Sequence, residues 1–391
     1  MTHQVISRGL RPFPVHMPSG QRYWTVLDDD RLTPVPAADE FLRHVRFGRD
    51  QAESTTRTYA GAVVLYLTWC RCTGRDWTTA AGRLGSFMFW LRHSTGDGSP
   101  VAAGPGSEPV RGPRRINTVL AGVREFLTHG TTLGTVPTFV LSQLYEVADD
   151  RDLPMQARGE GSHLRYYAKA RHRAAEPQEP VGRASDEEVL ALLRACRSAR
   201  DRFIVLLLAR TGLRRSEAVG MRREDIHFIL DASVLGCRIP GSHLHVVRRD
   251  NDNGAWAKSK RSRAVPVDFL LVQAYDQYVV ERDTCLEARD SDFVLVNLFR
   301  PPLGAPMPPG ALNDLFDRLS RRAGLADGVH PHALRHGFAS NAADAGAVLD
   351  EIADLLGHAS AASSQVYLHP DPQRLRSAVE RVAALAPRRN G

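Results

Sequence analysis

The apolar residues in the first half of the chain recur mostly at intervals of three and four positions, which is the spacing of one face of an α-helix. Five segments between Pro36 and Val147 show this pattern, and Gly-, Pro- and Ser-rich stretches separate them. The segments are ADEFLRHV, STTRTYAGAVVLYLTWCR, AGRLGSFMFWLRHS, INTVLAGVREFLTH and PTFVLSQLYEV. We therefore predict a helical bundle over residues 33–150. It follows an irregular, proline-rich N-terminal arm at 1–32 that contains one strand-like piece, QRYWTVL.

The periodicity is lost after residue 150 and returns near residue 185. The segment from Arg151 to Arg183 holds seven Lys and Arg residues against four acidic residues, so we interpret residues 151–182 as a basic interdomain linker. Ser185 and Glu188 then predict a capping box at the start of a helix. Strand-like pieces, HLHVV and RAVPV, lie within 226–267. Further helices are predicted near 268–289, 310–323, 332–345, 348–357, 361–369 and 373–385.

These patterns predict a mainly α fold with a small β-sheet (α+β), in which residues 183–391 form a second domain with a C-terminal tail helix. A chain of 391 residues is also too long for one ordinary core. The net charge is +7, and residues 248–263 hold six Lys and Arg against two Asp. Basic residues gathered in a loop and a linker suit a polyanion such as DNA, although solvated loops look the same.

Cysteine usage and hydropathy indicate a reducing, aqueous compartment. The cysteines are Cys70, Cys72, Cys196, Cys237 and Cys285. They form no C-x-x-C pair and support neither a disulfide framework nor a cysteine zinc site, so we expect reduced core or surface residues. No run of eighteen apolar residues occurs, and the N-terminal MTHQVISRGLRPFPVHMP lacks the apolar core of a signal peptide. We therefore expect a cytoplasmic protein, and a nucleoid-associated one where DNA is its partner.

Two basic side chains stand at the ends of predicted elements in the second domain. Arg214, within TGLRRSEAVGM, follows an apolar helix and a Thr-Gly break, where a side chain can emerge from the end of a buried element. Lys258, within AWAKSKRSRAVPV, lies at the tip of a predicted β-hairpin. Taken alone, each reads as a solvated surface residue.

The motif HPHALRHGFAS carries His332, Arg335 and His336 at spacing i, i+3 and i+4, so all three share one face of a helix. Two histidines at H-x-x-x-H invite a zinc interpretation. However, Ala333 stands where H-E-x-x-H has its general-base Glu, and Arg335 would place a fixed positive charge beside the metal. Two imidazoles and a guanidinium attract an anion instead, and phosphate fits best.

The last two pieces are a Leu-Leu-Gly-His sequence ending at His358 and, nine residues later, Tyr367. Alone they read as a helix stop with a capping histidine and a packed aromatic ring. Together with the other motifs they supply the parts of a metal-free displacement at a phosphodiester. In this hypothesis Arg214 and Arg335 clamp the phosphate, Tyr367 attacks, and His332 handles the tyrosine proton.

Two further residues complete the hypothesis. Lys258, on a mobile hairpin, reaches the leaving 5′ oxygen and protonates it. Glu217, three residues after Arg214, is placed to orient that arginine rather than to bind a metal. The reaction therefore calls for no cofactor and no metal.

In this order the motifs resemble the tyrosine recombinase (phage integrase) family. TGLRRSE, the hairpin lysine before AVPV, HALRH, LLGH and the step to Tyr367 match the family's pattern over about residues 183–390. STTRTYAGAVVLYLTW and INTVLAGVREFL resemble the family's core-binding domain more weakly. The resemblance implies a site-specific DNA recombinase, the integrase or transposase of a mobile element. Its two domains would form a C-shaped clamp around double-stranded DNA.

The resemblance also implies roles for single residues. Tyr367 would form a 3′-phosphotyrosyl bond and leave a free 5′ hydroxyl, so that rejoining needs neither ATP nor metal. The matching positions that carry over with it are Arg214, Lys258, His332, Arg335 and His358, with Lys258 preferred over Lys260 because of its distance to Pro266. Glu217 and His336 are expected to support them. The residues expected to contact DNA are Arg57, Arg248, Arg249, Lys260, Arg261 and Arg263.

The tail carries an apolar stripe formed by Leu375, Val379, Val382 and Leu385. It either folds back onto its own core or, as the resemblance implies, docks on a neighbouring protomer and assembles a tetramer on two DNA sites, with accessory recombinases as further partners. Three other functions stay open. They are a type IB topoisomerase-like nicking-closing enzyme, a catalytically silent DNA-binding protein, and a metallohydrolase that uses His332 and His336.

Overall fold

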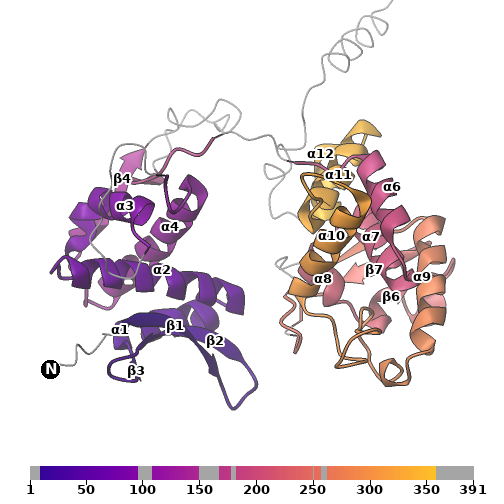
Figure 1. Cartoon of the computed structure of the whole chain (residues 1–391), viewed down its shortest axis with the longest axis horizontal. Coiled ribbons are helices and arrows are strands. Elements are labelled where there is room, and N and C mark those ends of the chain that lie inside the picture. Colours follow the sequence, from indigo (N-terminus) through magenta and orange to yellow (C-terminus); the bar gives the residue numbers. More distant parts are fainter. Residues whose placement is uncertain are drawn as a thin grey trace, which may run out of the picture. The chain divides into compact units, whose positions relative to one another are not determined.

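The protein divides into two compact units, Met1–Gln178 and Glu179–Gly391. The structure is a computed structural model, and it describes residues 9–95, 108–148, 167–177, 182–249, 251–256 and 262–357. Figure 1 shows the first unit in indigo to magenta and the second in pink to yellow. The described residues are mostly helical and carry three small antiparallel sheets, which confirms the predicted fold class. No helix among them has the length and apolarity needed to cross a bilayer.

The first unit is a helical bundle with a small sheet packed on it. Its strands are β1 (Leu10–His16), β2 (Arg22–Asp28), β3 (Thr33–Pro34), β4 (Tyr145–Ala148) and β5 (Tyr167–Ala170). Its helices are α1 (Pro36–Arg43), the π-helical turn η1 (His44–Gly48), α2 (Glu53–Cys72), the 3-10 turn η2 (Ala80–Arg83), α3 (Leu84–His93), α4 (Pro113–Thr132) and α5 (Val140–Leu144). The two long helices, α2 and α4, lie side by side and pack so closely that a Cβ on Gly122 would stand 2.8 Å from the Ala62 side chain.

Residues 10–34 form an antiparallel sheet in the order β1-β2-β3, so the prediction of an irregular arm is wrong there. Tyr23 and Val26 of β2 are buried in the core of the first unit, and the backbone N–H of Trp24 donates to Thr56 Oγ1 of α2 at 3.0 Å. The prolines of LRPFPVH did not prevent pairing because β1 is an edge strand, where missing N–H groups can face solvent.

The predicted linker is partly a piece of the first unit. Strand β5 pairs with β4, in the register Tyr145↔Ala170, and Ala174 is buried in the same core. The Asn117 side chain of α4 bonds both backbone groups of Ala174, donating to its carbonyl at 2.9 Å and accepting from its N–H at 2.8 Å. The helix predicted for PTFVLSQLYEV therefore ends at Leu144, because the rest of that segment is used as β4.

The second unit surrounds a small sheet with helices. Its helices are α6 (Asp186–Ala195), α7 (Ala199–Thr211), α8 (Arg215–Val219), α9 (Phe269–Asp283), α10 (Pro309–Ala323), α11 (Pro331–Asp344) and α12 (Leu349–Leu356). Short 3-10 turns are η5 (Arg223–Asp225), η6 (Ala232–Leu235) and η7 (Leu286–Ala288). The strands β6 (Ile226–His227), β7 (His243–Val246) and β8 (Arg263–Pro266) form an antiparallel sheet in that order.

Several local predictions for this unit are confirmed. Ser185 and Glu188 form the expected capping box at the start of α6, with bonds of 2.8 and 3.2 Å. HLHVV and RAVPV form β7 and β8, which pair as an antiparallel hairpin. The helices predicted near 361–369 and 373–385 lie outside the described residues.

Helix α7 is the centre of the second core and determines where the chain enters α8. Phe203, Leu207 and Leu208 are fully buried. The helix ends at Gly212, whose φ of +60° favours glycine. A Cβ there would stand 2.5 Å from Phe338 of α11 and 2.9 Å from Leu356 of α12. The end of α7 and the two C-terminal described helices are therefore packed together at this glycine.

Candidate active site

Arg214 lies in the short connection between α7 and α8, where it is the N-cap residue of α8. Its backbone N–H and its Nη1 donate to the two carboxylate oxygens of Glu217, at 3.0 and 2.9 Å. Its Nη1 also donates to the Leu356 carbonyl at 3.3 Å. The Arg214 side chain is 25% exposed, so its guanidinium is held by the protein on one side and reaches solvent on the other.

Glu217 is a buried carboxylate shared by two arginines, since its side chain is 0% exposed. Arg263 of β8 donates to it through Nη1 at 3.3 Å and Nη2 at 2.8 Å, in addition to the bonds from Arg214. Burial alone would raise the pKa of Glu217, but the hydrogen bonds and charge of Arg263, with the charge of Arg214, bring that pKa below its ordinary value. Glu217 is therefore an anion that orients both guanidinium groups, as predicted for Arg214.

Arg335 of α11 is 1% exposed and joins the ends of two helices. Its Nη1 donates to the Gly212 carbonyl at 2.7 Å, and its Nη2 donates to the Leu356 carbonyl at 2.8 Å. The last carbonyls of a helix have no partner within the helix and carry partial negative charge, so a guanidinium is a favourable partner for them.

Three arginines converge on the end of α12. The Leu356 carbonyl accepts from both Arg214 and Arg335, and the neighbouring Leu355 carbonyl accepts from Arg263 Nε at 2.9 Å. Gly357, with a φ of +65°, ends the helix, and a Cβ on it would stand 2.6 Å from Arg263 Nη1. We call Arg214, Glu217, Arg263 and Arg335 the arginine network. It holds the point from which the chain continues to His358 and Tyr367.

His332 and His336 lie on successive turns of α11, and their rings meet at a centroid distance of 4.2 Å. His332 is exposed, whereas His336 is 9% exposed. In the described parts of the chain these two histidines belong to no group of three or more potential metal ligands. The rings meet edge to face, at an interplanar angle of 73°, and the exposed imidazole of His332 can exchange a proton with a bound substrate.

The structure brings three of the predicted site residues into one hydrogen-bonded network. They are Arg214, Glu217 and Arg335, and His332 lies one turn before Arg335 on α11. Other predicted residues lie outside the described part of the chain, namely Lys258, His358 and Tyr367, with Lys260 and Arg261. By sequence Lys258 belongs to the connection between the paired strands β7 and β8.

Two arginines predicted to contact DNA form ion pairs within the protein. Arg263 is 9% exposed and belongs to the arginine network. Arg249 forms a two-pronged ion pair with Asp225, at 2.7 and 2.9 Å, and bonds Glu224 at 2.7 Å. The hydrogen bond with Asp225 is the main reason why the pKa of Arg249 is raised. Sequence alone could not show these pairings, because the carboxylates come from other elements.

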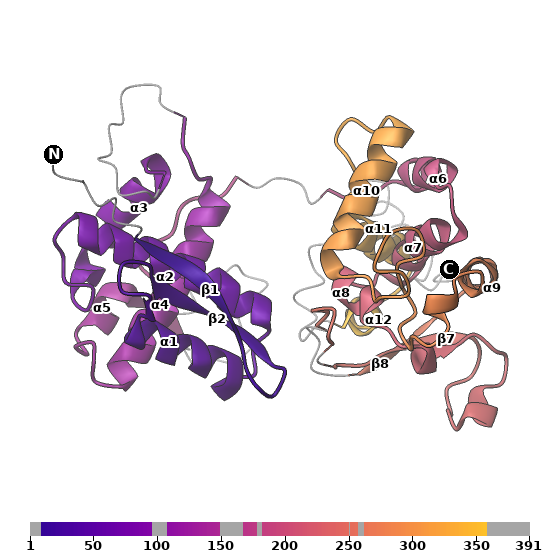
Figure 2. The same ribbon diagram turned by 60° about the horizontal axis from the view of Figure 1, so that its bottom comes forward.

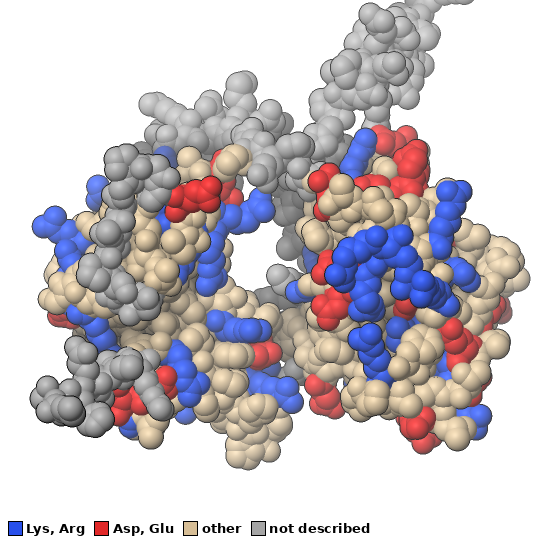
Figure 3. Space-filling model, in the orientation of Figure 1, with Lys and Arg blue, Asp and Glu red and all other residues tan. Residues whose placement is uncertain are grey.

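The other described candidates for DNA contact stay predictions. The guanidinium of Arg248 lies 4.8 Å from the centre of the Trp256 ring, and that of exposed Arg57 lies 5.0 Å from the centre of the Trp24 ring. Figure 3 shows further Lys and Arg side chains gathered on the second unit, in the region where Figure 1 shows α10. Arg321 and Arg322, at the end of α10, are exposed.

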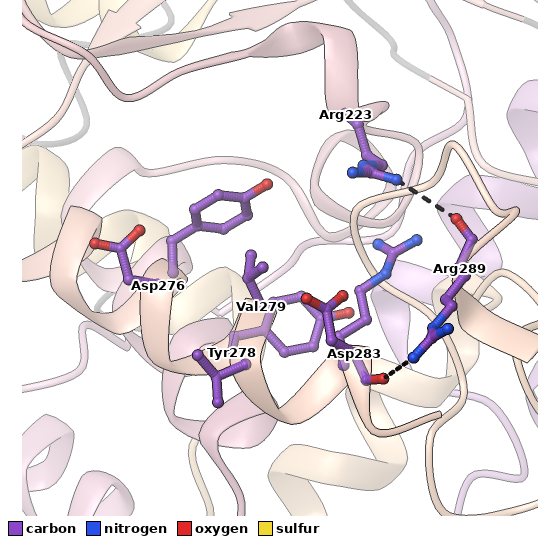
Figure 4. Close-up of a pocket in the computed structure, with 9 residues that line it drawn as sticks. Arg223, Asp276, Tyr278, Val279, Asp283 and Arg289 are labelled. Atoms are coloured by element: carbon purple, nitrogen blue, oxygen red, sulfur yellow. Dashed lines mark hydrogen bonds between the residues drawn. The ribbon is translucent and has the colours of Figure 1, made fainter. Parts of the chain in front are cut away.

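A pocket of about 650 Å³ lies elsewhere in the second unit (Figure 4). Tyr275, Asp276 and Asp283 of α9 line it together with Arg223 and Arg289. None of the predicted site residues lines it, so it does not take part in the chemistry considered above.

A group that the sequence analysis did not recognise lies on the sheet of the second unit. Cys237 was expected to be an isolated core or surface residue, but it lies with His227, His243 and His245. The available signal was the H-x-H spacing in HLHVV, which places two histidines on one face of a strand. A cysteine six residues earlier shows no metal-binding spacing until the chain folds.

Comparison with known proteins decides the family. Residues 183–374 match the phage integrase family. The second unit is a phage integrase domain. The family of this domain is that of the tyrosine recombinases, which catalyse the cleavage and rejoining of DNA strands. The resemblance inferred from TGLRRSE, HALRH and LLGH is thereby confirmed.

The similarity to one curated relative extends beyond the integrase domain. Transposase A from transposon Tn554 of Staphylococcus aureus is 25% identical over 298 residues, which are 75% of this chain and 76% of that protein. Tyrosine recombinase XerC of Staphylococcus aureus strain MSSA476 is 30% identical over 197 residues, which are 49% of this chain and 57% of that protein.

A solved structure supports the fold. The crystal structure of XerH site-specific recombinase, bound to palindromic difH substrate as a post-cleavage complex, has a TM-score of 0.50. Its sequence identity is 19%, and the match covers 90% of this chain and 91% of that chain. At this identity the likeness concerns the fold alone.

Proposed function

We propose that this protein is a site-specific recombinase that integrates or transposes a mobile element through a covalent 3′-phosphotyrosyl intermediate. The arginine network carries the proposal. It supports a phosphate site at Arg214 and Arg335, because both guanidinium groups converge on the carbonyl of Leu356. Tyr367 lies eleven residues further along the chain.

The network suits a phosphodiester in its transition state. Negative charge builds on the non-bridging oxygens during displacement, and cations held in place beforehand stabilise that charge without reorganising. Glu217 and the helix-end carbonyls hold the guanidinium groups, and the partly exposed Arg214 side chain offers access from solvent. A lysine at these positions would be a point charge without the fork that bonds two partners at once.

The reaction is a transesterification in which bonds and protons balance. The Tyr367 oxygen attacks the scissile phosphorus, a phosphorus–oxygen bond to tyrosine forms, and the bond to the 5′ oxygen breaks. His332 takes the tyrosine proton, and Lys258 gives a proton to the leaving 5′ oxygen. His358 adds a contact to the phosphate. The reverse reaction with a 5′ hydroxyl of a partner strand rejoins DNA, and it uses the energy kept in the phosphotyrosyl bond.

The partner proposed for this site is double-stranded DNA in a cytoplasmic nucleoid. The XerH structure is described as bound to a difH substrate, and the Tn554 protein as a transposase. A basic chain with net charge +7 is compatible with such a partner. Assembly of a tetramer through the tail stripe, with accessory recombinases, stays a prediction of the resemblance.

The test is trapping of the covalent intermediate. Nicked duplexes made from the DNA that flanks the gene lose a short fragment after cleavage, so the attacked strand stays bound to protein. We expect a protein–DNA adduct that survives denaturing electrophoresis with the natural chain and is absent with Tyr367→Phe. Tyr275→Phe, in the same unit, is the matched control and should form the adduct as the natural chain does.

Each alternative function predicts a different result. A topoisomerase-like enzyme would relax supercoiled DNA without recombining paired sites. A catalytically silent protein would bind DNA and form no adduct, and a metallohydrolase would cut DNA without one. An adduct that persists in Tyr367→Phe would contradict the proposed nucleophile.

A further inference from the structure

Three histidines and one cysteine meet on the small sheet of the second unit, and none of them belongs to the arginine network. His227 ends β6, Cys237 follows the turn η6, and His243 and His245 lie on β7. One potential ligand atom from each residue lies within 4.8 Å of all the others. Figure 2 shows β7 and β8 side by side, with the segment that contains η6 projecting from the second unit.

The geometry of the sheet explains why these side chains meet. Residues alternate between the faces of a strand, and Leu244 and Val246 are buried in the main core, so His243 and His245 project from the other face. His227 is directly opposite His243 in the ladder and shares that face. Centroid distances among the three rings are 4.9, 4.6 and 4.9 Å.

The segment between β6 and β7 brings the sulfur atom to this face. After η6 the Cys237 N–H donates to the Ala232 carbonyl at 3.1 Å, and the chain then leads back to β7. His243 is 0% exposed, although it lies on the face away from the main core. A fully buried histidine next to a thiol and two other imidazoles calls for an explanation beyond packing.

The distances among Cys237, His243 and His245 match those of tetrahedral zinc coordination. With Zn–S of about 2.3 Å and Zn–N of about 2.05 Å, the sulfur–nitrogen edge of the tetrahedron is about 3.6 Å and the nitrogen–nitrogen edge about 3.3 Å. Here Cys237 Sγ lies 3.4 Å from His243 Nε2 and 3.6 Å from His245 Nε2, and the two Nε2 atoms are 3.2 Å apart. Three of the four ligands are thus spaced as a bound ion would hold them.

The protonation of the rings fits the same arrangement. His243 Nδ1 donates to the Gly241 carbonyl at 2.7 Å, so in the neutral ring the lone pair is on Nε2 and faces the group. His227 Nδ1 is buried and has no hydrogen-bond partner among the described residues.

We propose that His227, Cys237, His243 and His245 bind one Zn²⁺ ion. One thiolate and three imidazoles form a closed, four-ligand set, which is the arrangement of a structural rather than a catalytic site. The ion would fasten residues 228–242 to the sheet. It would also stiffen β7, whose Val246 pairs with Arg263 of the arginine network.

The experiment measures metal in the full-length protein. The chain is purified without a histidine tag from zinc-supplemented medium, and its metals are quantified by mass spectrometry. We expect about one zinc per chain in the natural protein and a loss of at least about ten-fold in Cys237→Ser and in His245→Asn. The matched control is Cys285→Ser, because Cys285 is partly buried in the same unit and lies outside the group. It should keep its zinc.

Replacement of zinc by Co²⁺ in the natural chain provides a second readout that needs no variant. A tetrahedral cobalt site with one thiolate must show visible d–d bands and a sulfur-to-metal charge-transfer band. Absence of both bands, natural protein with less than about a tenth of a zinc per chain, or equal zinc in Cys237→Ser and Cys285→Ser would overturn the proposal. These readouts do not depend on DNA cleavage, so the zinc site and the proposed function fail separately.

Discussion

The sharpest stability prediction concerns Glu217, the buried carboxylate between Arg214 and Arg263. Glu217→Gln keeps the shape of the side chain and removes its charge. The natural carboxylate accepts four hydrogen bonds, at 3.0, 2.9, 3.3 and 2.8 Å, all from the two arginines. A glutamine has one oxygen for these donors and turns its amide N–H groups toward the others, so about half of the bonds are lost.

The expected cost follows from those bonds. A hydrogen bond to a charged group contributes about 1.5–3 kcal/mol, so the loss of two is about 3–6 kcal/mol. The neutral amide is less costly to bury than the carboxylate, which offsets part of this. We therefore expect Glu217→Gln to lower the free energy of unfolding of the integrase domain by about 2–4 kcal/mol.

Urea unfolding of the full chain at 25 °C, followed by circular dichroism, measures this change. Glu224→Gln is the matched control, because the Glu224 side chain is 71% exposed and pairs with Arg249 on the surface. It should cost about 0–1 kcal/mol. A Glu217→Gln variant that unfolds within about 0.5 kcal/mol of the natural chain, or no differently from Glu224→Gln, would refute the reasoning.

The difference in stability between the natural chain and Glu217→Gln should also depend on pH. The pKa of Glu217 in the folded chain lies below its ordinary value of 4.5. The carboxylate therefore stabilises the fold fully above that value, and its contribution is lost as the pH falls through the folded-state pKa. The difference in stability between the natural chain and Glu217→Gln should be constant near neutral pH and should shrink at acidic pH.

Three further predictions test the packing at Gly212, the role of Arg335 and the contact between Asn117 and the segment after β5. Gly212→Ala should destabilise the integrase domain by about 2–4 kcal/mol in thermal or urea unfolding, because the added Cβ clashes with its neighbours and the backbone there is left-handed. Gly236 has a φ of +75° and nothing within 4 Å of an added Cβ, so Gly236→Ala should cost only about 1 kcal/mol. Equal costs for the two variants would contradict the packing argument. Arg335→Lys should slow adduct formation on nicked DNA by at least about 100-fold, because it cannot bridge the Gly212 and Leu356 carbonyls as a guanidinium does; an unchanged rate would count against the arginine clamp. Asn117→Ala should release residues 172–177 from α4 and speed their cleavage in limited proteolysis, whereas unchanged cleavage would show that β5 alone holds that segment.

Much of the integrase domain could be predicted from sequence because its signals are local. A capping box at Ser185, apolar periodicity through α7, and alternation in HLHVV are properties of short segments. The order of the charged motifs then indicated the family before any contact was known. The β1–β2 sheet and the β4–β5 pair were missed because strand pairing depends on a partner distant in the sequence.

The sequence indicated which residues form the candidate site better than it indicated the surroundings of each side chain. Arg214 and Arg335 were expected to act together, and both bond the Leu356 carbonyl. Arg263 was expected on a DNA-facing surface because its neighbours in sequence are basic, but the fold turns it inward onto Glu217. The group of one cysteine and three histidines was not predicted, because its members come from three segments that meet only in the folded chain.

The most direct test of the account identifies the residue that becomes bonded to DNA. The trapped adduct is digested with protease and nuclease, and the modified peptide is sequenced by tandem mass spectrometry. We expect a nucleotide joined through its 3′ phosphate to Tyr367, within the peptide that contains SSQVYLHP. A nucleotide joined to any other residue, or cleavage of cognate DNA with no modified peptide, would contradict it.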